Sequence, residues 1–254
     1  MTFLDVVAIL GALAWTPHIF KVISNIFSVA KVRVIAQRTT EIGFTTFGPI
    51  FNIRLAFAVE TKDIVISEIK LRLTHEGGDE KLFSWQGIVQ HMGRMTLPNA
   101  VMPYEKESSV LAIKLNQKDI EERFIRFQDP LYIDGQREYL YRADKKRSYL
   151  IAESKYDPKA FLREPEMAEI YNFNKHSFPW KIGKYCVKIE ISSPEKFKVI
   201  DNKFEFNLSS MEVEMLQKNK EFLELDYKRF VYVPLEDNEE FEWQWVNPPL
   251  VKLN

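Results

Sequence analysis

A period-two alternation of apolar and polar side chains is the feature that most constrains the fold of this chain. In residues 51–59 every second side chain is apolar, and Asn52 and Arg54 lie between them. The pattern returns at 69–74 and at 184–191. Such alternation is typical of strands with one buried and one solvated face. The chain is therefore expected to be mainly β.

Turn-forming pairs separate these runs. Gly77-Gly78 predicts a tight hairpin, and Asp201-Asn202 predicts a second turn. Further strands are predicted at 31–37, 81–86, 110–115, 197–200 and 204–208. Because no regular strand–helix alternation accompanies them, the strands predict an antiparallel two-sheet sandwich over residues 31–208.

The strand patterning of 31–115 and 184–208 resembles that of immunoglobulin-like domains. The resemblance would make Trp85 a core tryptophan of the sandwich. The paired cysteines of antibody domains are missing, because Cys186 is the only cysteine. A resemblance of this kind implies a fold and carries no activity with it.

Residues 92–183 differ in composition and are expected to form an insertion or a second layer. Helices are predicted at 138–150 and 164–171, whereas 117–128 fits a helix or a strand. The prolines of this segment are expected to interrupt its elements, and they are Pro98, Pro103, Pro130, Pro158, Pro165 and Pro179.

Aromatic residues are dense in the same segment and define a candidate interaction surface. Tyrosine and tryptophan are frequent at interfaces because they bury a large area and keep a polar group. The candidate residues are Tyr132, Tyr139, Tyr141, Tyr149, Tyr156 and Trp180. The alternative is that they form a satellite core under long loops.

The first 30 residues are the most apolar part of the chain. Residues 6–15 contain no polar side chain, and apolar residues resume at 19–27. A helix of this length reaches the roughly 30 Å of a hydrocarbon core. Pro17 is expected to bend it. The segment is expected to be a membrane anchor, with two alternatives: it lies in the membrane interface, or it packs on its own domain.

Charges beside this segment predict its orientation. Asp5 precedes the apolar run, whereas Lys31, Arg33 and Arg38 follow it. The positive-inside rule then predicts a single-pass protein with the large C-terminal domain in the cytoplasm. The lipid bilayer is accordingly one expected partner.

The C-terminal part, 209–254, is expected to be a helix followed by an acidic tail. Ser209 and Glu212 have the spacing of a capping box and predict where the helix begins. Ten acidic side chains here outnumber five basic ones. The whole chain has a net charge of −1, which argues against nucleic-acid binding.

No catalytic, cofactor or metal motif is present in the sequence, so no cofactor is expected. Two chemical alternatives remain. They are a metal site from His75, Asp79 and His91, and a thiolate nucleophile from Cys186 with His176.

Together these features predict a membrane-anchored, cytoplasm-facing β-sandwich that acts as an interaction or adaptor protein and binds another protein. One alternative is a membrane-associated, hydrolase-like enzyme with a site between sandwich and insertion that uses His75, His91 or His176. Another is a soluble binding domain whose first helix packs on the body or on a partner.

Overall fold

A computed structural model describes residues 14–20, 23, 28–97, 100–108, 112–230 and 242–253, and it describes side chains in these ranges except at 88–97, 100–108 and 229–230. Most of the predicted anchor, 1–30, therefore lies outside the described residues. So does most of the acidic part of the tail.

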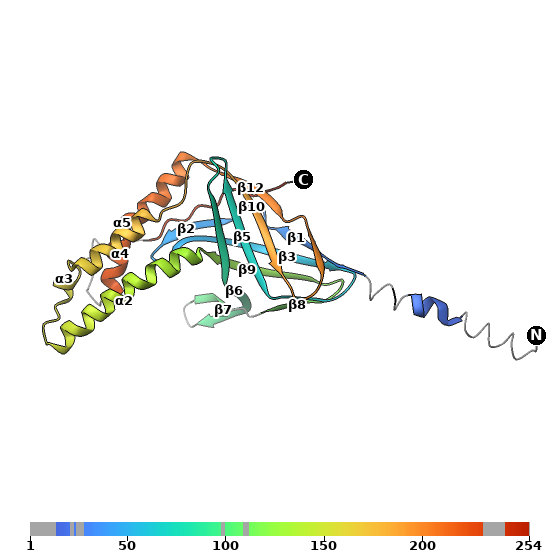
Figure 1. The fold of residues 1–254 in the computed structure, drawn as a ribbon, viewed down its shortest axis with the longest axis horizontal. Helices are drawn as coiled ribbons and strands as arrows, with labels where there is room; N and C mark the ends of the chain where they lie inside the picture. Colours follow the sequence, from blue (N-terminus) through green and yellow to red (C-terminus); the bar gives the residue numbers. More distant parts are fainter. Residues whose placement is uncertain are drawn as a thin grey trace, which may run out of the picture.

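One 11-stranded sheet forms the body of the protein (Figure 1). Its path is β11-β1-β3-β9-β6-β5-β10-β12-β13, with β2 added to β3 and β7 added to β6. The strands are β1 Ala30–Ala36, β2 Glu41–Thr45, β3 Gly48–Glu60, β5 Glu68–His75, β6 Glu80–Leu97, β7 Ala100–Ser108, β9 Ile120–Gln128, β10 Gly183–Ser192, β11 Phe197–Ile200, β12 Lys203–Leu208 and β13 Val251–Lys252. A separate two-stranded sheet pairs β4 Ile64–Ile66 with β8 Ile113–Leu115.

The sheet curls until its two ends adjoin. β11 pairs with β1 at one end of the path, whereas β12 pairs with β10 near the other end, yet only Asp201 and Asn202 connect them. Asp201 adopts a left-handed φ of 60° and accepts ion pairs from Arg33 on β1 and Lys252 on β13. The connection therefore holds the two ends of the sheet together.

The C-terminal segment makes a second link between distant strands. Ile42 on β2 exchanges two backbone hydrogen bonds with Val246, at 2.9 and 3.0 Å. A few residues later, β13 pairs with β12. Because the segment bonds to both strands, it covers backbone groups that would otherwise be left unpaired at a strand edge.

The inside of the curl is filled with apolar side chains, as the alternation predicted. Phe51, Ile53, Leu55, Phe57 and Val59 are all buried, while Arg54 points outward. Their counterparts on the other strands are Val32, Val34, Ile69, Leu71, Leu73, Phe83, Ile125, Phe127, Val187 and Ile189. Burial of this many aliphatic and aromatic groups is the main stabilising term of the fold.

These observations confirm the mainly β class and both predicted turns. They do not confirm an immunoglobulin-like sandwich, because the strands form one curled sheet and a small second sheet. Residues 117–128, which fitted a helix or a strand, contain β9, and β9 lies between β3 and β6.

Four described helices, α2 to α5, form a lobe at one end of the sheet (Figure 1). They are α2 Pro130–Ala152, α3 Pro158–Phe161, α4 Pro165–His176 and α5 Ser210–Phe230. The predicted capping box starts α5: the Ser209 N–H donates to Glu212 Oε2 at 2.8 Å, and the Glu212 N–H donates to Ser209 Oγ at 3.3 Å.

At the opposite end of the molecule, residues 14–20 form a short helical stretch (Figure 1). Its side chains are exposed, including Trp15 at 68% and Phe20 at 72%. Within the ranges that the structure describes, no helix has both the length and the apolar character needed to cross a bilayer.

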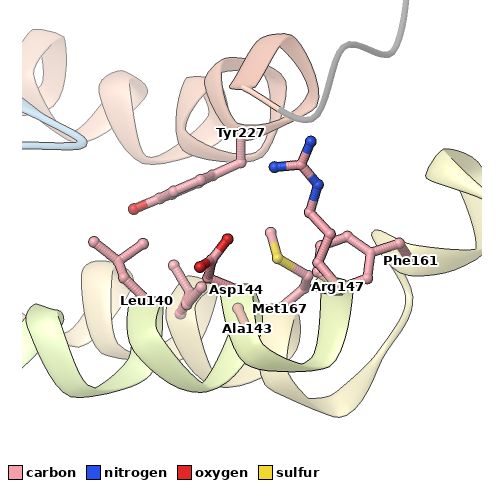
Figure 2. Close-up of a pocket in the computed structure, with 8 residues that line it drawn as sticks. Leu140, Ala143, Asp144, Arg147, Phe161, Met167 and Tyr227 are labelled. Atoms are coloured by element: carbon pink, nitrogen blue, oxygen red, sulfur yellow. The ribbon is translucent and has the colours of Figure 1, made fainter. Parts of the chain in front are cut away.

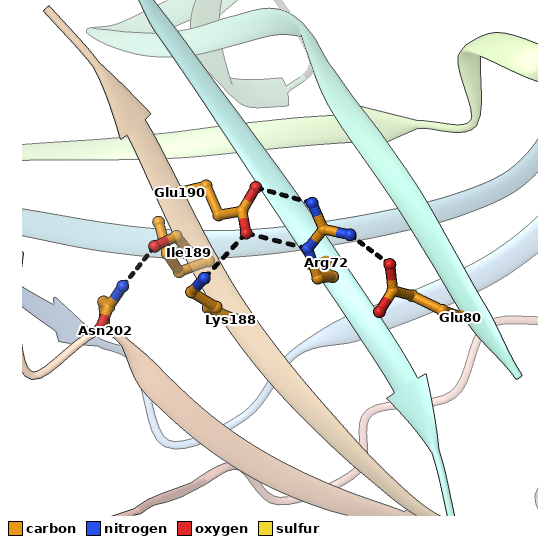
Figure 3. A network of polar contacts seen from close by, with 6 residues as sticks. All are labelled: Arg72, Glu80, Lys188, Ile189, Glu190 and Asn202. Carbon is orange, nitrogen blue, oxygen red and sulfur yellow. Dashed lines mark hydrogen bonds and ion pairs between the residues drawn. The ribbon is translucent and has the colours of Figure 1, made fainter. Parts of the chain in front are cut away.

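An ion-pair ladder crosses the outer face of β6, β5 and β10 (Figure 3). Arg72 donates from Nε to Glu190 Oε1 at 2.9 Å and also pairs with Glu80. Lys188 Nζ lies 3.0 Å from the same Glu190 oxygen. These bonds lower the pKa of Glu190 from 4.5 to about 2, and Arg72 is the largest cause.

Because this pKa is lower in the folded protein, the contribution of Glu190 is complete above pH 4.5 and disappears as the pH falls through about 2. We expect Glu190→Gln to remove about 1 kcal/mol of this acid-sensitive stability, a modest value because the pair is partly exposed. Urea unfolding from pH 6 to pH 2 measures it. Arg72→Gln should flatten the same part of the curve, and an unchanged pH dependence in both variants would contradict the assignment.

Candidate interaction surface

Acid–proline pairs start three helices of the lobe: Asp129-Pro130, Asp157-Pro158 and Glu164-Pro165. Proline suits the first helical position because its missing N–H is not needed there. Pro130, Pro158 and Pro165 were expected to interrupt the elements of this segment, but each of them begins a helix instead. The predicted helices at 138–150 and 164–171 fall within or overlap α2 and α4.

Asp129 fixes the first turn of α2 to the sheet. Its Oδ1 accepts hydrogen bonds from the N–H groups of Leu131 and Tyr132, and its Oδ2 lies 2.9 Å from Lys81 Nζ on β6. The side chain is buried, and both of its oxygens have partners. The direction in which α2 leaves the sheet is thus set by a cap and an ion pair.

A buried polar cluster, formed by Tyr132, Gln136, Asn174 and Tyr227, holds α2, α4 and α5 together. The Tyr132 hydroxyl donates to Asn174 Oδ1 at 2.6 Å, while Asn174 Nδ2 donates to the Tyr227 hydroxyl at 3.1 Å. Gln136 Nε2 lies 2.8 Å from the Tyr227 hydroxyl and 2.9 Å from the carbonyl oxygen of Thr46. The cluster therefore also reaches the β2–β3 turn.

Burial raises the pKa of both tyrosines in this cluster. The pKa of Tyr227 rises to about 12, and that of Tyr132 rises further for the same reason. Both hydroxyls stay protonated at physiological pH, so they serve as neutral hydrogen-bonding groups that fix helix positions.

The outward face of α2 carries exposed aromatic residues among basic ones. Tyr141 is 66% exposed and Tyr149 is 56% exposed, and Lys145 lies one turn from each. Beside them, Arg142 Nη1 pairs with Glu169 Oε2 of α4 at 2.9 Å. The Arg142 guanidinium also lies 4.9 Å from the centre of the Tyr139 ring.

Two shallow depressions, of about 420 and 510 Å³, follow the seam between α2 and α4 and share Arg142 and Glu169. The first is lined by Arg142, Lys145, Lys146, Tyr149, Pro165, Glu166 and Glu169. The second is lined by Tyr139, Arg142, Glu169, Asn172, Phe173, His176 and Ser177. Both are open to solvent and mix aromatic with charged groups, which suits a protein contact better than a small-molecule pocket.

The six aromatic residues singled out from the sequence divide into three pairs. Tyr132 and Trp180 are buried in the core, where the Trp180 indole N–H donates to the carbonyl of Gly43 at 3.0 Å. Tyr139 and Tyr156 are half-buried against Phe173 and Phe161. Tyr141 and Tyr149 are exposed, and we keep these two as the centre of the candidate surface.

Arg142, Lys145 and Glu169 were not predicted to belong to this surface, since Lys145 was interpreted as part of a solvated basic loop and Glu169 as part of a helix surface. Their positions relative to the tyrosines follow from helical spacing once the starts of α2 and α4 are known. The acid–proline pairs were the signal that marks those starts.

The histidines that the sequence offered for catalysis or metal binding make different structural contacts. His75 Nδ1 accepts a hydrogen bond from the Gly77 N–H, and its Nε2 lies 3.0 Å from the Ile182 carbonyl oxygen, so His75 links the tip of the β5–β6 hairpin to the residue that precedes β10. His176 lies 2.7 Å from the Asn172 carbonyl at the end of α4. The side chain of His91 is outside the described residues.

The metal site and the thiolate nucleophile are the two other chemical alternatives. In the described part of the chain no three His, Cys, Asp or Glu side chains are grouped as metal ligands. Cys186 lies on β10 opposite Thr74 and Glu205, on the polar face of the sheet, whereas His176 lies in the helical lobe.

Comparison of the chain with protein-family models, with curated proteins and with solved structures finds no match.

Proposed function

We propose that this protein is a membrane-anchored adaptor whose curled sheet is a rigid scaffold and whose helical lobe binds another protein in the cytoplasm. The observation that carries the proposal is the exposed, aromatic and basic face of α2 around Tyr141 and Tyr149. Tyrosine and arginine are the residue types enriched where protein partners bind most strongly.

The N-terminal segment supports the membrane part of the proposal. Its described residues expose Trp15, Ile19, Phe20 and Ile23 instead of burying them on the sheet. Exposed apolar groups on a helix favour insertion in lipid over packing on its own domain. The basic residues after it favour a cytoplasmic domain.

The arrangement of the molecule also fits an adaptor. The short N-terminal helical stretch and the helical lobe lie at opposite ends of the sheet (Figure 1). A membrane at one end would leave the face of α2 open to a partner at the other. An immunoglobulin-like scaffold, the finer fold that we predicted, would serve the same purpose.

We expect Tyr141→Ala combined with Tyr149→Ala to lower partner recovery at least about tenfold, because exposed aromatic anchors carry much of an interface's binding energy. Crosslinked pull-down of the full chain from membranes measures it. Leu131→Ala is the matched control, since Leu131 is 80% exposed and lies about 27 Å along the same helix from Tyr149. Equal recovery by the double variant and the control would refute the surface.

Membrane attachment has a separate test. We expect simultaneous replacement of Trp15, Ile19, Phe20 and Ile23 by serine to move the protein from the carbonate-resistant fraction to the supernatant, because each loses about 1.5–3 kcal/mol of burial in lipid. His18→Ser, an exposed change on the same helix, should leave the distribution unchanged. Wild-type protein in the supernatant would rule out the anchor.

A further inference from the structure

A small apolar cavity lies inside the helical lobe, apart from the exposed face of α2. Its volume is about 150 Å³, and residues from α2, α3, α4 and α5 line it. The lining consists of Leu140, Ala143, Asp144, Arg147, Phe161, Met167, Ile170 and Tyr227. Apolar cavities of this size stay dry and accept a group as large as a benzene ring.

Two charged residues of α2 stand at this cavity. Figure 2 shows Asp144 and Arg147 pointing from α2 toward α5, beside the space under the Tyr227 ring. They are three positions apart, so their side chains project from the same face of the helix. Within the described residues no ion pair joins Asp144 to Arg147, or either of them to another side chain.

Arg147 lacks a hydrogen-bond partner for one of its buried donor atoms. Its guanidinium lies over the Tyr156 ring, 5.6 Å from the centre, while its buried Nε has no hydrogen-bond partner among the described residues. A buried donor without a partner is costly, and a cationic one favours a carboxylate. The Asp144 carboxylate, which lines the same cavity, can accept hydrogen bonds from a cationic group bound there.

We propose that this cavity binds a free amino acid with an aliphatic or aromatic side chain. The side chain fills the apolar space, the carboxylate accepts from Arg147, and the ammonium group donates to Asp144. Both charges of the ligand are then neutralised by Asp144 and Arg147, neither of which has an ion-pair partner among the described residues. This site is independent of the proposed adaptor surface, because Tyr141 and Tyr149 are not among its lining residues.

The site is expected to need both the carboxylate and the ammonium group of its ligand, and this distinguishes a free amino acid from molecules that carry only one of them. A residue at a peptide terminus carries only one of the two charges, and so does an amine or a fatty acid. Ligands that lack one charge are therefore expected to bind at least about tenfold more weakly, because one charge-assisted hydrogen bond is lost.

Calorimetric titration of the full chain in detergent micelles tests the proposal. L-leucine, L-methionine and L-phenylalanine are the probes. Three analogues serve as comparisons: 4-methylpentanoate lacks the ammonium group, 3-methylbutylamine lacks the carboxylate, and glycine lacks the side chain. We expect saturable binding of at least one probe below about 10 mM. Absence of binding by all three probes, or equal binding by an analogue, overturns the proposal.

Variants locate the binding in this cavity. Ala143→Met fills the space and should abolish binding, and Arg147→Gln and Asp144→Asn should each weaken it about tenfold. Glu138→Gln, an exposed change on the same helix that does not line the cavity, should leave binding unchanged. If Ala143→Met does not fold, Arg147→Gln and Asp144→Asn decide whether binding occurs in this cavity, and Asp144→Asn is expected to fold because Asp144 is exposed. Binding that they leave unaffected overturns the assignment.

Discussion

Gly48→Ala is expected to destabilise the protein by about 3 kcal/mol, since it combines backbone strain with a clash. Gly48 begins β3 with a φ of +82°, in the left-handed region that favours glycine. A methyl group there would approach the Tyr132 ring to 2.3 Å. Neither the start of β3 nor the first turn of α2 can move without disturbing the contact between sheet and lobe. Urea unfolding at neutral pH measures the loss.

Gly78→Ala separates the two causes. Gly78 has a similar φ of +91°, but no atom lies within 4 Å of the position of an added Cβ. Only the conformational cost remains, about 1 kcal/mol. The difference between the two variants therefore reports how tightly Tyr132 packs on the β2–β3 turn. Equal losses would mean that the helical lobe yields at this contact.

Local patterning predicted much of the sheet. The alternation at 51–59 and 184–191 identified buried and exposed positions in β3 and β10, and Gly77-Gly78 and Asp201-Asn202 marked real turns. Each of these signals acts within about ten residues of chain, which is the range over which side-chain period and turn chemistry are decided.

The curl of the sheet was not predictable in the same way. Asp201-Asn202 correctly marks a turn, yet the strands on either side of it pair with β1 and β10 and not with each other. For β11 that choice depends on a partner strand more than 100 residues away, since Ala30 pairs with Phe197. The pairing of Ile42 with Val246 is another long-range choice, and no local pattern contains it.

For the candidate surface, the composition of the sequence indicated the region but not which of its tyrosines are exposed. The density of tyrosines pointed to 132–180, but exposure differs along a single helix. Tyr132 and Tyr141 belong to α2, and only Tyr141 is exposed, because Tyr132 faces the sheet and the buried polar cluster. Predicting this split needs the start of α2 at Pro130 and the packing of the lobe on the sheet.

Asn174→Ala should cost about 3 kcal/mol and loosen the helical lobe more than the sheet. Asn174 is completely buried on α4. It accepts from the Tyr132 hydroxyl and donates to that of Tyr227, so its loss deprives groups on α2 and α5 of buried partners. Each unsatisfied buried group costs about 1–3 kcal/mol, and alanine replaces none of these bonds.

Asn172→Ala is the matched control for this change, because Asn172 is exposed on the same helix and its side chain makes no hydrogen bond to the described residues. We expect it to change the unfolding free energy by no more than about 0.5 kcal/mol. Hydrogen exchange adds the location: in Asn174→Ala the amides of α2 and α4 should exchange faster, while those of β3 and β10 keep their protection under native conditions. Uniform loss of protection would instead mean that lobe and sheet unfold as one unit, and that the buried polar cluster is part of a single core.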